Sequence, residues 1–343
     1  MRKVFVIAEA GVNHNGDEKI ASELIRIAAR SGADAVKFQT FSSDKLVTRN
    51  APKADYQSLM TGNGPQRDML KALELSQETY FRLSNLCSEE GVEFMSTPFD
   101  EEAANMLIEL GMKTIKVPSG EITNIPFLIV LAKKSLPIIL STGMANMAEI
   151  QAGVKAIKET WNKNCLTMPP DALTVLHCTS NYPTKFTDVN LRAMNSIART
   201  LSLPIGYSDH TLGTAVSAAA VALGATVIEK HFTLDQNMDG PDHKASLNPE
   251  ELRSFVANIR AIEQCLGSDI KEPTRSELPI RALVRRSVTL VKDLEVGDEI
   301  NSNDIALLRP GTGISPADFD RVPGHKLKKK MSAGTTLTWH DLA

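Results

Sequence analysis

Two lysines and several hydroxyl-bearing residues each follow a short apolar run of the sequence. Lys37 and Lys116 end two such runs, and Ser119 comes shortly after Lys116. Hydroxyl groups follow three other runs, at Thr97, Ser141 and Ser208. Ammonium and hydroxyl groups that meet in one cleft can hold an anion with phosphate and carboxylate groups. The alternative chemistry is a lysine that forms a Schiff base with a carbonyl substrate.

Two histidines follow the last two of these apolar runs. His210 comes after residues 203–207, and His231 comes after residues 225–228. If the two runs are neighbouring strands, their ends could bring both imidazoles onto one metal ion. Two imidazoles with water or substrate oxygen suit a labile octahedral ion better than a closed zinc site. We therefore expect a divalent metal, Mn²⁺ in the first place, with Mg²⁺ or Co²⁺ as alternatives.

Three carboxylates form the remaining group with chemical potential. Glu9 ends the first apolar run, Glu121 follows Ser119, and Asp242 lies in a Gly-Pro-Asp-His segment. Carboxylates accept hydrogen bonds from a polyhydroxy substrate, and one near a reacting carbon can act as an acid or a base. The Gly-Pro neighbours of Asp242 leave a plain turn residue as the other interpretation.

Most of these residues stand at or shortly after the ends of eight short apolar runs, and amphipathic helical stretches separate most of the runs. The runs cover residues 4–8, 35–36, 92–95, 114–115, 137–140, 173–176, 203–207 and 225–228. Eight β–α units make a closed parallel barrel, whose active site lies at the carboxyl ends of the strands. The pattern therefore predicts an α/β fold of the TIM (β/α)8 type and places the chemistry at one mouth of the barrel.

The chain of 343 residues exceeds the length of one barrel, and its texture changes after residue 267. We expect a catalytic barrel over residues 1–267, a polar linker over 268–284 and a small β-rich domain over 285–343. In that last domain, residues 287–291 are typical of a strand, and residues 303–305 could open a helical turn. The long connection over residues 41–75 is expected to be a substrate loop.

Composition excludes several classes of protein. The net charge is −3 and the basic residues are scattered, which argues against a nucleic-acid partner. The apolar runs are too short to cross a membrane, and the N-terminus leads directly into the first of them, so we expect no signal peptide. The four cysteines have neither disulfide nor zinc spacing, which favours reduced thiols in a cytoplasmic protein.

Seven motifs, in this order, strongly resemble the sialic acid synthase family, which includes N-acetylneuraminate and N,N'-diacetyllegionaminate synthases. They lie at residues 8–16, 36–40, 96–99, 116–121, 140–144, 207–211 and 229–233. The tail resembles the antifreeze-like (SAF) domain of that family, with Arg309-Pro310-Gly311-Thr312-Gly313 at the expected place. The resemblance covers essentially the whole chain.

The resemblance implies a synthase that condenses phosphoenolpyruvate with an N-acetylated hexose aldehyde. By that resemblance, phosphoenolpyruvate is held by Lys37, Thr97, Lys116, Ser119, Ser141, Ser180 and Ser208, and the metal is held by His210 and His231. Ser180 stands where family members that make N-acetylneuraminate often have asparagine. The sugar would be faced by Glu9, Glu121, Tyr182 and Asp242. Family members are homodimers in which the SAF domain covers the partner's barrel mouth, so Arg309 would reach the N-acetyl group.

Several rival functions share parts of this pattern. A pseudaminic acid synthase, or another phosphoenolpyruvate-condensing synthase of 2-keto sugar acids, would need much the same residues. A synthase acting on a phosphorylated aldose would need a second basic cluster, which the sequence does not display. A lysine Schiff-base aldolase remains open, as does a non-catalytic sugar-binding or ice-binding protein built on the tail. The polar strand ends argue against this last class.

Overall fold

Eight parallel strands form the centre of the N-terminal part of the molecule. The structure is a computed structural model that describes residues 3–169 and 171–343. The strands are β1 (Phe5–Gly11), β2 (Ala35–Thr40), β3 (Glu93–Pro98), β4 (Ile115–Val117), β5 (Ile138–Ser141), β6 (Leu173–Cys178), β7 (Ile205–Asp209) and β8 (Val227–His231). Each overlaps one of the eight apolar runs, so the predicted strand pattern is confirmed. Several strands continue past their runs, so Glu9, Lys37 and Lys116 lie within β1, β2 and β4 and not after them.

The strands pair in the order β3-β2-β1-β8-β7-β6-β5-β4. Strands β3 and β4, at the two ends of this series, also contact each other, so the barrel is nearly closed. Inside it, small and branched side chains such as Ile7, Ala35 and Val227 pack together. A second and larger apolar layer fills the space between the strands and the helices. Burial on both faces explains why these strands appear in the sequence as continuous apolar runs.

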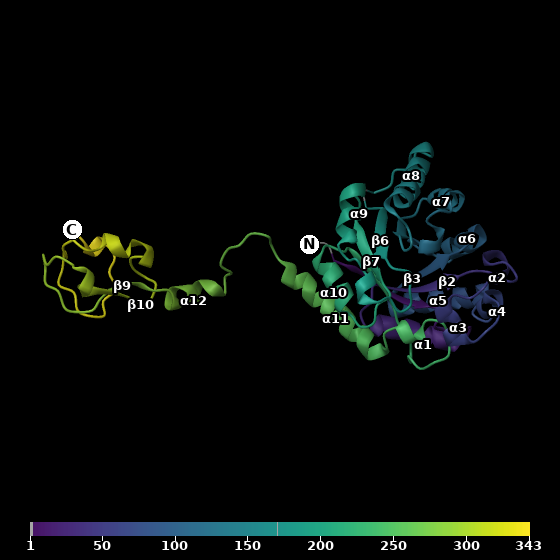
Figure 1. The fold of residues 1–343 in the computed structure, drawn as a ribbon, viewed down its shortest axis with the longest axis horizontal. Coiled ribbons are helices and arrows are strands. Elements are labelled where there is room, and N and C mark those ends of the chain that lie inside the picture. Colours follow the sequence, from purple (N-terminus) through teal and green to yellow (C-terminus); the bar gives the residue numbers. More distant parts are fainter. Residues whose placement is uncertain (1–2, 170) are drawn as a thin grey trace. The chain divides into compact units, whose positions relative to one another are not determined.

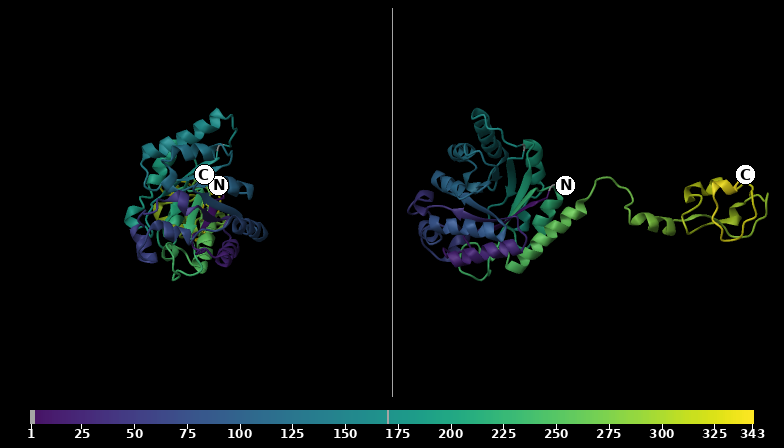
Figure 2. Two further views of the ribbon diagram at one scale, coloured as in Figure 1. Left: turned by 90° about the vertical axis from the view of Figure 1, so that its right-hand side faces the viewer. Right: turned by 180° about the vertical axis from the view of Figure 1, so that it is seen from behind.

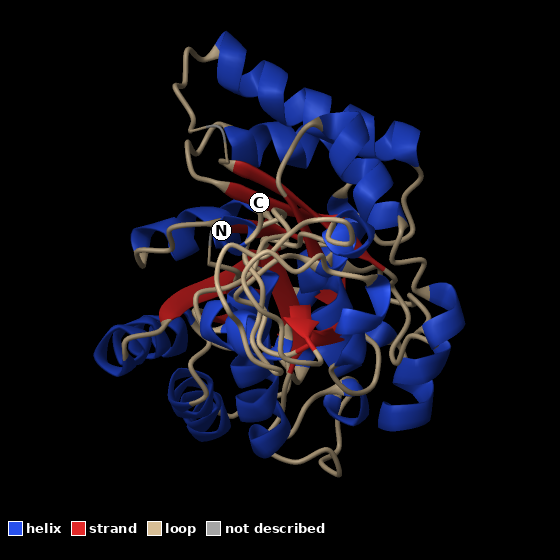
Figure 3. Ribbon diagram, turned by 90° about the vertical axis from the view of Figure 1, so that its left-hand side faces the viewer, coloured by secondary structure: helices blue, strands red, loops and turns tan. Residues whose placement is uncertain are grey.

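Helices surround the strands, as Figures 2 and 3 show. They are α1 (Glu18–Arg30), α5 (Gln77–Glu90), α6 (Glu101–Glu109), α7 (Ile125–Ala132), α8 (Met147–Lys163), α9 (Ala193–Leu201), α10 (Ala215–Ala222) and α11 (Pro249–Leu266). Helix α1 illustrates the local logic: the Asp17 side chain accepts hydrogen bonds from the first backbone N–H groups, and Leu24 and Ala28 are buried against the barrel.

The connection between β2 and α5 is the longest on the catalytic side and contains three short helices. These are α2 (Ser43–Leu46), α3 (Asp55–Thr61) and α4 (Gln66–Lys71). Short 3₁₀ turns occur elsewhere in the described chain, at Ser119–Glu121, Phe186–Asp188, His243–Ala245, Ser302–Asp304, Pro316–Arg321 and Trp339–Asp341.

The chain divides into two units, Met1–Gly267 and Ser268–Ala343 (Figure 1). The second unit holds α12 (Glu277–Val284), which lies inside the segment expected to be a linker, and an antiparallel pair of β9 (Ser287–Leu290) and β10 (Ile305–Leu308). It has its own apolar core, with Val288, Ile300 and Leu337 fully buried. None of the helices in the described residues combines the length and apolarity that a bilayer crossing requires.

Candidate active site

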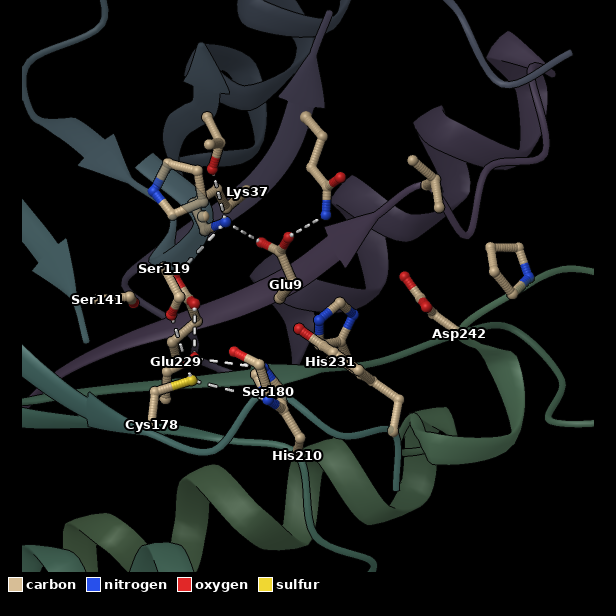
Figure 4. A pocket seen from close by; sticks show the side chains of 18 of the residues that line it. Glu9, Lys37, Ser119, Ser141, Cys178, Ser180, His210, Glu229, His231 and Asp242 are labelled. Carbon is tan, nitrogen blue, oxygen red and sulfur yellow. Dashed lines mark hydrogen bonds and ion pairs between the residues drawn. The ribbon is translucent and has the colours of Figure 1, made fainter. Parts of the chain in front are cut away.

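A cavity of about 220 Å³ opens at the carboxyl ends of the barrel strands. Twelve of the residues singled out from the sequence line it, and Figure 4 shows most of them pointing toward one another. They are Glu9, Lys37, Thr97, Lys116, Ser119, Ser141, Ser180, Tyr182, Ser208, His210, His231 and Asp242. The structure thus brings residues from distant parts of the chain to one mouth, because parallel strands present their carboxyl ends on the same side.

Two buried lysines share one carboxylate on the floor of this cavity. Nζ of Lys37 lies 3.5 Å from Oε2 of Glu229, and Nζ of Lys116 lies 3.5 Å from Oε1 of the same residue. Lys37 also contacts Glu9, with Nζ 2.6 Å from Oε2, and donates a 3.0 Å hydrogen bond to the Thr97 hydroxyl. All four charged side chains, those of the two lysines and the two glutamates, are almost completely buried, so their interactions are poorly screened by solvent.

The two lysines keep Glu229 ionised. Burial alone would raise its pKa, but the ammonium groups of Lys116 and Lys37 outweigh burial and lower the pKa of Glu229 to about 2. Burial disfavours the ammonium form of Lys37, yet the carboxylates of Glu229 and Glu9 raise its pKa. Burial lowers the pKa of Lys116, and the positive charge of Lys37 lowers it further. The neighbouring carboxylates therefore offset the effect of burial less completely at Lys116 than at Lys37.

Two other carboxyls in the cavity have pKa values raised toward neutral pH. Burial raises the pKa of Glu9 to about 7, although Lys37 opposes this. Burial also raises the pKa of Asp242 to about 6, with His210 opposing. Carboxyls whose pKa values differ this much from that of Glu229 can divide the roles of fixed charge and proton carrier within one site.

Hydroxyl groups complete the anion-binding character of the floor. Ser208 donates a 2.9 Å hydrogen bond to Oε1 of Glu229, and the backbone N–H of Gly143 donates a 2.9 Å hydrogen bond to the Ser119 hydroxyl. A Cβ atom at Gly143 would lie 2.2 Å from the Ser180 hydroxyl, so only glycine allows this close approach. Among the described residues, the buried Ser141 hydroxyl has no hydrogen-bond partner, which leaves it available to a ligand.

His210 and His231 face each other at the ends of β7 and β8, with ring centroids 5.6 Å apart. Two imidazoles on one ion have centroids at most about 6.4 Å apart, for metal–nitrogen bonds of about 2.1 Å. Nδ1 of His210 donates a 2.8 Å hydrogen bond to the Thr179 carbonyl, which leaves Nε2 as a lone-pair donor. Within the described chain, Nδ1 of His231 is buried without a hydrogen-bond partner, and burial holds the pKa of His231 well below its usual range.

The two imidazoles therefore fit a divalent ion. No cluster of three or more His, Cys, Asp or Glu side chains placed to hold a metal occurs among the residues that the structure describes. An ion held here would need oxygen ligands from water or substrate, which is the donor set of a labile octahedral metal. A closed structural zinc site does not match this arrangement.

An aromatic and apolar wall stands beside the histidines. The Tyr182 ring stacks on His210, with centroids 4.1 Å apart, and lies 5.2 Å from the Tyr56 ring. Tyr56, Met69 and Leu73 all come from the long connection between β2 and α5. That connection thus forms part of the cavity wall.

Sequence reasoning missed two residues at the centre of the site. It assigned no role to Glu229, although this residue pairs with both lysines. Cys178 lies 3.7 Å from the Ser119 hydroxyl and 3.8 Å from Nδ1 of His210. Burial alone would raise the pKa of the Cys178 thiol, but His210 outweighs burial and lowers it. The alternation along β6 and β8 was the available signal, because Cys178 and Glu229 each stand two residues after an apolar residue that points into the barrel, Leu176 and Val227.

Two of the expected residues do not line the cavity. Glu121 ends the 3₁₀ turn that begins at Ser119, and its carboxylate accepts a 2.7 Å hydrogen bond from the Asn124 side chain. Arg309 belongs to the second unit, where it follows β10 and is exposed. Its expected role at the barrel of a partner subunit stays a prediction.

Comparison with known protein families identifies both units. Residues 24–271 match the model of the NeuB family, and residues 285–343 match that of the SAF domain. A protein of Legionella pneumophila named N,N'-diacetyllegionaminic acid synthase is 53% identical over 342 residues, which cover 98% of this chain and 94% of the relative. A protein of the same name from Campylobacter jejuni is 46% identical, over 94% of this chain and 96% of the relative.

A solved structure shows the same architecture. The crystal structure of N-acetylneuraminic acid (sialic acid) synthetase from Leptospira borgpetersenii, in complex with citrate, superposes with a TM-score of 0.71. The match has 34% sequence identity and covers 81% of this chain and 90% of the other.

Proposed function

This chain belongs to the NeuB family, and on that premise we propose that it is a nonulosonic (sialic) acid synthase. It condenses phosphoenolpyruvate with the open-chain aldehyde of an N-acetylated hexosamine and yields a nine-carbon 2-keto acid and inorganic phosphate. The observation that carries the proposal is the pair of buried lysines beside two facing histidines in one cavity. The reaction requires cations that bind the phosphoenolpyruvate anion and imidazoles that bind a metal ion.

In this mechanism the lysines bind and orient phosphoenolpyruvate. The ammonium groups of Lys37 and Lys116 offset the charge of its phosphate and carboxylate, and the hydroxyls of Thr97, Ser119, Ser141, Ser180 and Ser208 surround it. Holding two reactants in line can lower the barrier by ~7–11 kcal/mol. Glu229 neutralises part of the positive charge of the two lysines. The bound anion neutralises the remainder.

The bond-forming sequence follows from the two substrates. The enol carbon of phosphoenolpyruvate attacks the aldehyde carbon, and positive charge builds at the carbon that bears the phosphate ester. Water adds at that carbon, and the tetrahedral intermediate expels phosphate. A divalent ion held by His210 and His231, which we propose to be Mn²⁺, would act as a Lewis acid toward the aldehyde oxygen.

The carboxyls provide acid–base chemistry and hold the sugar. Glu9, with a pKa of about 7, can donate or accept a proton near neutrality, and Gln39 fixes it through a 3.3 Å hydrogen bond. Asp242 and Tyr182 line the same cavity, with the Tyr182 ring beside both histidines, and would contact the sugar hydroxyls. Glu121, which the sequence also suggested, is the less suitable acid because Asn124 engages its carboxylate.

The two candidate sugars are N-acetylmannosamine and 2,4-diacetamido-2,4,6-trideoxymannose, and the second is favoured. The support is the name N,N'-diacetyllegionaminic acid synthase, which two relatives with 53% and 46% identity carry. The test incubates purified protein with phosphoenolpyruvate, Mn²⁺ and each sugar separately, and follows phosphate release and product mass. If no phosphate is released with either sugar, the proposed function is refuted. Preferential turnover of N-acetylmannosamine would refute the substrate assignment.

We also propose that the active form is a homodimer in which the SAF unit covers the partner's barrel mouth. Arg309 would then act on the sugar held by the other protomer. Co-expression of Lys116→Ala and Arg309→Ala chains tests this, because a mixed dimer would contain one intact site composed of residues from both chains. Activity of the mixture above that of either variant alone is expected, whereas purely subunit-internal sites would give no such recovery.

A further inference from the structure

A buried polar cluster lies behind the two histidines, on the helix-facing side of β7 and β8. Side chains alternate along a strand, so the residues next to Ser208, His210, Glu229 and His231 point away from the cavity. These residues are Asp209 and Lys230, which are directly paired across the β7–β8 ladder. Both side chains are completely inaccessible to solvent.

The cluster is closely connected. Nζ of Lys230 lies 3.1 Å from Oδ2 of Asp209 and donates a 2.8 Å hydrogen bond to the Thr211 carbonyl. Oδ1 of Asp209 accepts hydrogen bonds from the backbone N–H of Thr211 at 2.9 Å and from its hydroxyl at 2.7 Å. Oδ2 accepts a further 2.6 Å hydrogen bond from the hydroxyl of Ser217, on helix α10. Every polar group of the ion pair thus has a partner among the described residues.

These contacts hold the residues on both sides of His210. Asp209 precedes it and Thr211 follows it, and the Asp209 carboxylate binds the N–H and hydroxyl of Thr211. Lys230 precedes His231 and contacts the same turn through the Thr211 carbonyl. The same two side chains therefore link the backbone that carries one imidazole to the backbone that carries the other.

We propose that Asp209, Lys230, Thr211 and Ser217 form a clasp that sets the separation and orientation of His210 and His231 for the metal. They are positioning residues, because none of them lines the cavity. A buried ion pair adds little to stability compared with apolar side chains, but it can specify one arrangement of the backbone. The inference rests on the proposed metal site and adds the residues that preorganise it.

The test compares metal affinity with substrate affinity in the full-length protein. Lys230→Met removes the ammonium and keeps a side chain of similar length. Loss of a group that hydrogen-bonds a metal ligand weakens metal binding about 10–100-fold, and Lys230 acts one step further away, through the backbone, so the lower end of this range, about tenfold, applies. We expect a rise of this size in the Mn²⁺ dissociation constant, measured from the free-ion electron paramagnetic resonance signal, and a broadened spectrum of the bound ion. Phosphoenolpyruvate affinity, measured calorimetrically with chelator present, is expected to stay within about twofold.

Two further variants keep the test decisive. Val175→Ala removes buried volume from the helix-facing layer at β6, away from the clasp, and is expected to lower stability without changing Mn²⁺ affinity. Ser217→Ala deletes a single hydrogen bond to Asp209 and still removes part of the clasp if Lys230→Met fails to fold. A several-fold weaker Mn²⁺ affinity is expected for it.

The outcomes separate the two hypotheses. Wild-type protein that binds Mn²⁺, together with a folded Lys230→Met or Ser217→Ala variant that binds it equally well, would overturn the clasp and leave the proposed function intact. Wild-type protein with no Mn²⁺ affinity would overturn the metal site itself, and the clasp with it. Equal loss of Mn²⁺ affinity in Val175→Ala would show general destabilisation and would also overturn the clasp.

Discussion

Replacement of Glu229 by glutamine should destabilise the protein, because this carboxylate neutralises two buried ammonium groups. Its pKa of about 2 in the folded protein, against 4.5 for an ordinary glutamate, corresponds to ~3 kcal/mol in favour of the ionised form. Since the folded-state pKa is depressed, this stabilisation is fully present above about pH 4.5 and is lost as the pH falls toward 2. At pH 7, Glu229→Gln should therefore lose ~3 kcal/mol of unfolding free energy.

The loss can be measured by urea unfolding with chelator present, so that no divalent ion contributes. A loss of ~3 kcal/mol would lower the melting temperature of a barrel of this size by roughly 6–12 °C. Trp161, buried against the barrel, reports its unfolding when the other tryptophan is replaced in a Trp339→Phe background. Glu159→Gln is the matched control, since its carboxylate forms only exposed pairs on α8 and should change stability by less than about 0.5 kcal/mol.

The same variant should respond more strongly to anions. Without Glu229, a bound phosphate supplies the missing negative charge between Lys37 and Lys116, so saturating phosphate should raise the stability of Glu229→Gln more than that of the wild type. Wild-type stability in the variant, or equal stabilisation of both proteins by phosphate, would refute the view that this carboxylate balances the lysine pair.

Three further outcomes are expected. Lys116→Ala should abolish activity mainly through a large rise in the KM for phosphoenolpyruvate, and unchanged steady-state kinetics would remove Lys116 from the site. Thorough chelation should silence phosphate release and added Mn²⁺ should restore it, whereas full turnover of the chelated enzyme would make the two histidines structural. Burial lowers the pKa of His14 to about 4, so its contribution to stability is complete above about pH 6.5 and falls as the pH drops toward 4. His14→Gln should flatten this decline, by at most ~3 kcal/mol in unfolding free energy over that range, while the exposed control His340→Gln retains it.

The barrel could be predicted because its pattern is local. Each strand is buried on both faces, so runs such as residues 173–176 are apolar without interruption, and helix α1 displays its spacing through Leu24 and Ala28. Strand β10 was missed, since residues 303–305 suggested only a helical turn. That turn exists at Ser302–Asp304, but the strand after it depends on antiparallel pairing with β9, which a short local pattern does not reveal.

The same distinction between local and long-range patterns separates the site residues that could be predicted from those that could not. Residues that come just after the apolar runs, such as Lys37 and His231, could be anticipated because the barrel rule places the carboxyl ends of all the strands together. The role of Glu229 depends on side chains from β2 and β4, far away in the sequence, and could not be inferred from its neighbours. Tyr56 lies in a segment of irregular short helices with no periodicity to interpret. Glu121 is adjacent to a cavity residue in sequence, but the 3₁₀ turn directs it to Asn124.

The place where the barrel is not closed by a strand ladder, between β3 and β4, suggests a different order of the strands along the chain. Each hydrogen-bonded pair consists of two neighbours in the series β4-β5-β6-β7-β8-β1-β2-β3. This series begins at β4 and ends at β3. The residue before β1 is held to the second half of α11, since Arg260 donates a 2.7 Å hydrogen bond to the Val4 carbonyl. A circular permutant of residues 4–267 alone, opened at Gly111 and with the end of α11 joined to Val4, would therefore form its sheet entirely between strands that are consecutive in the new chain.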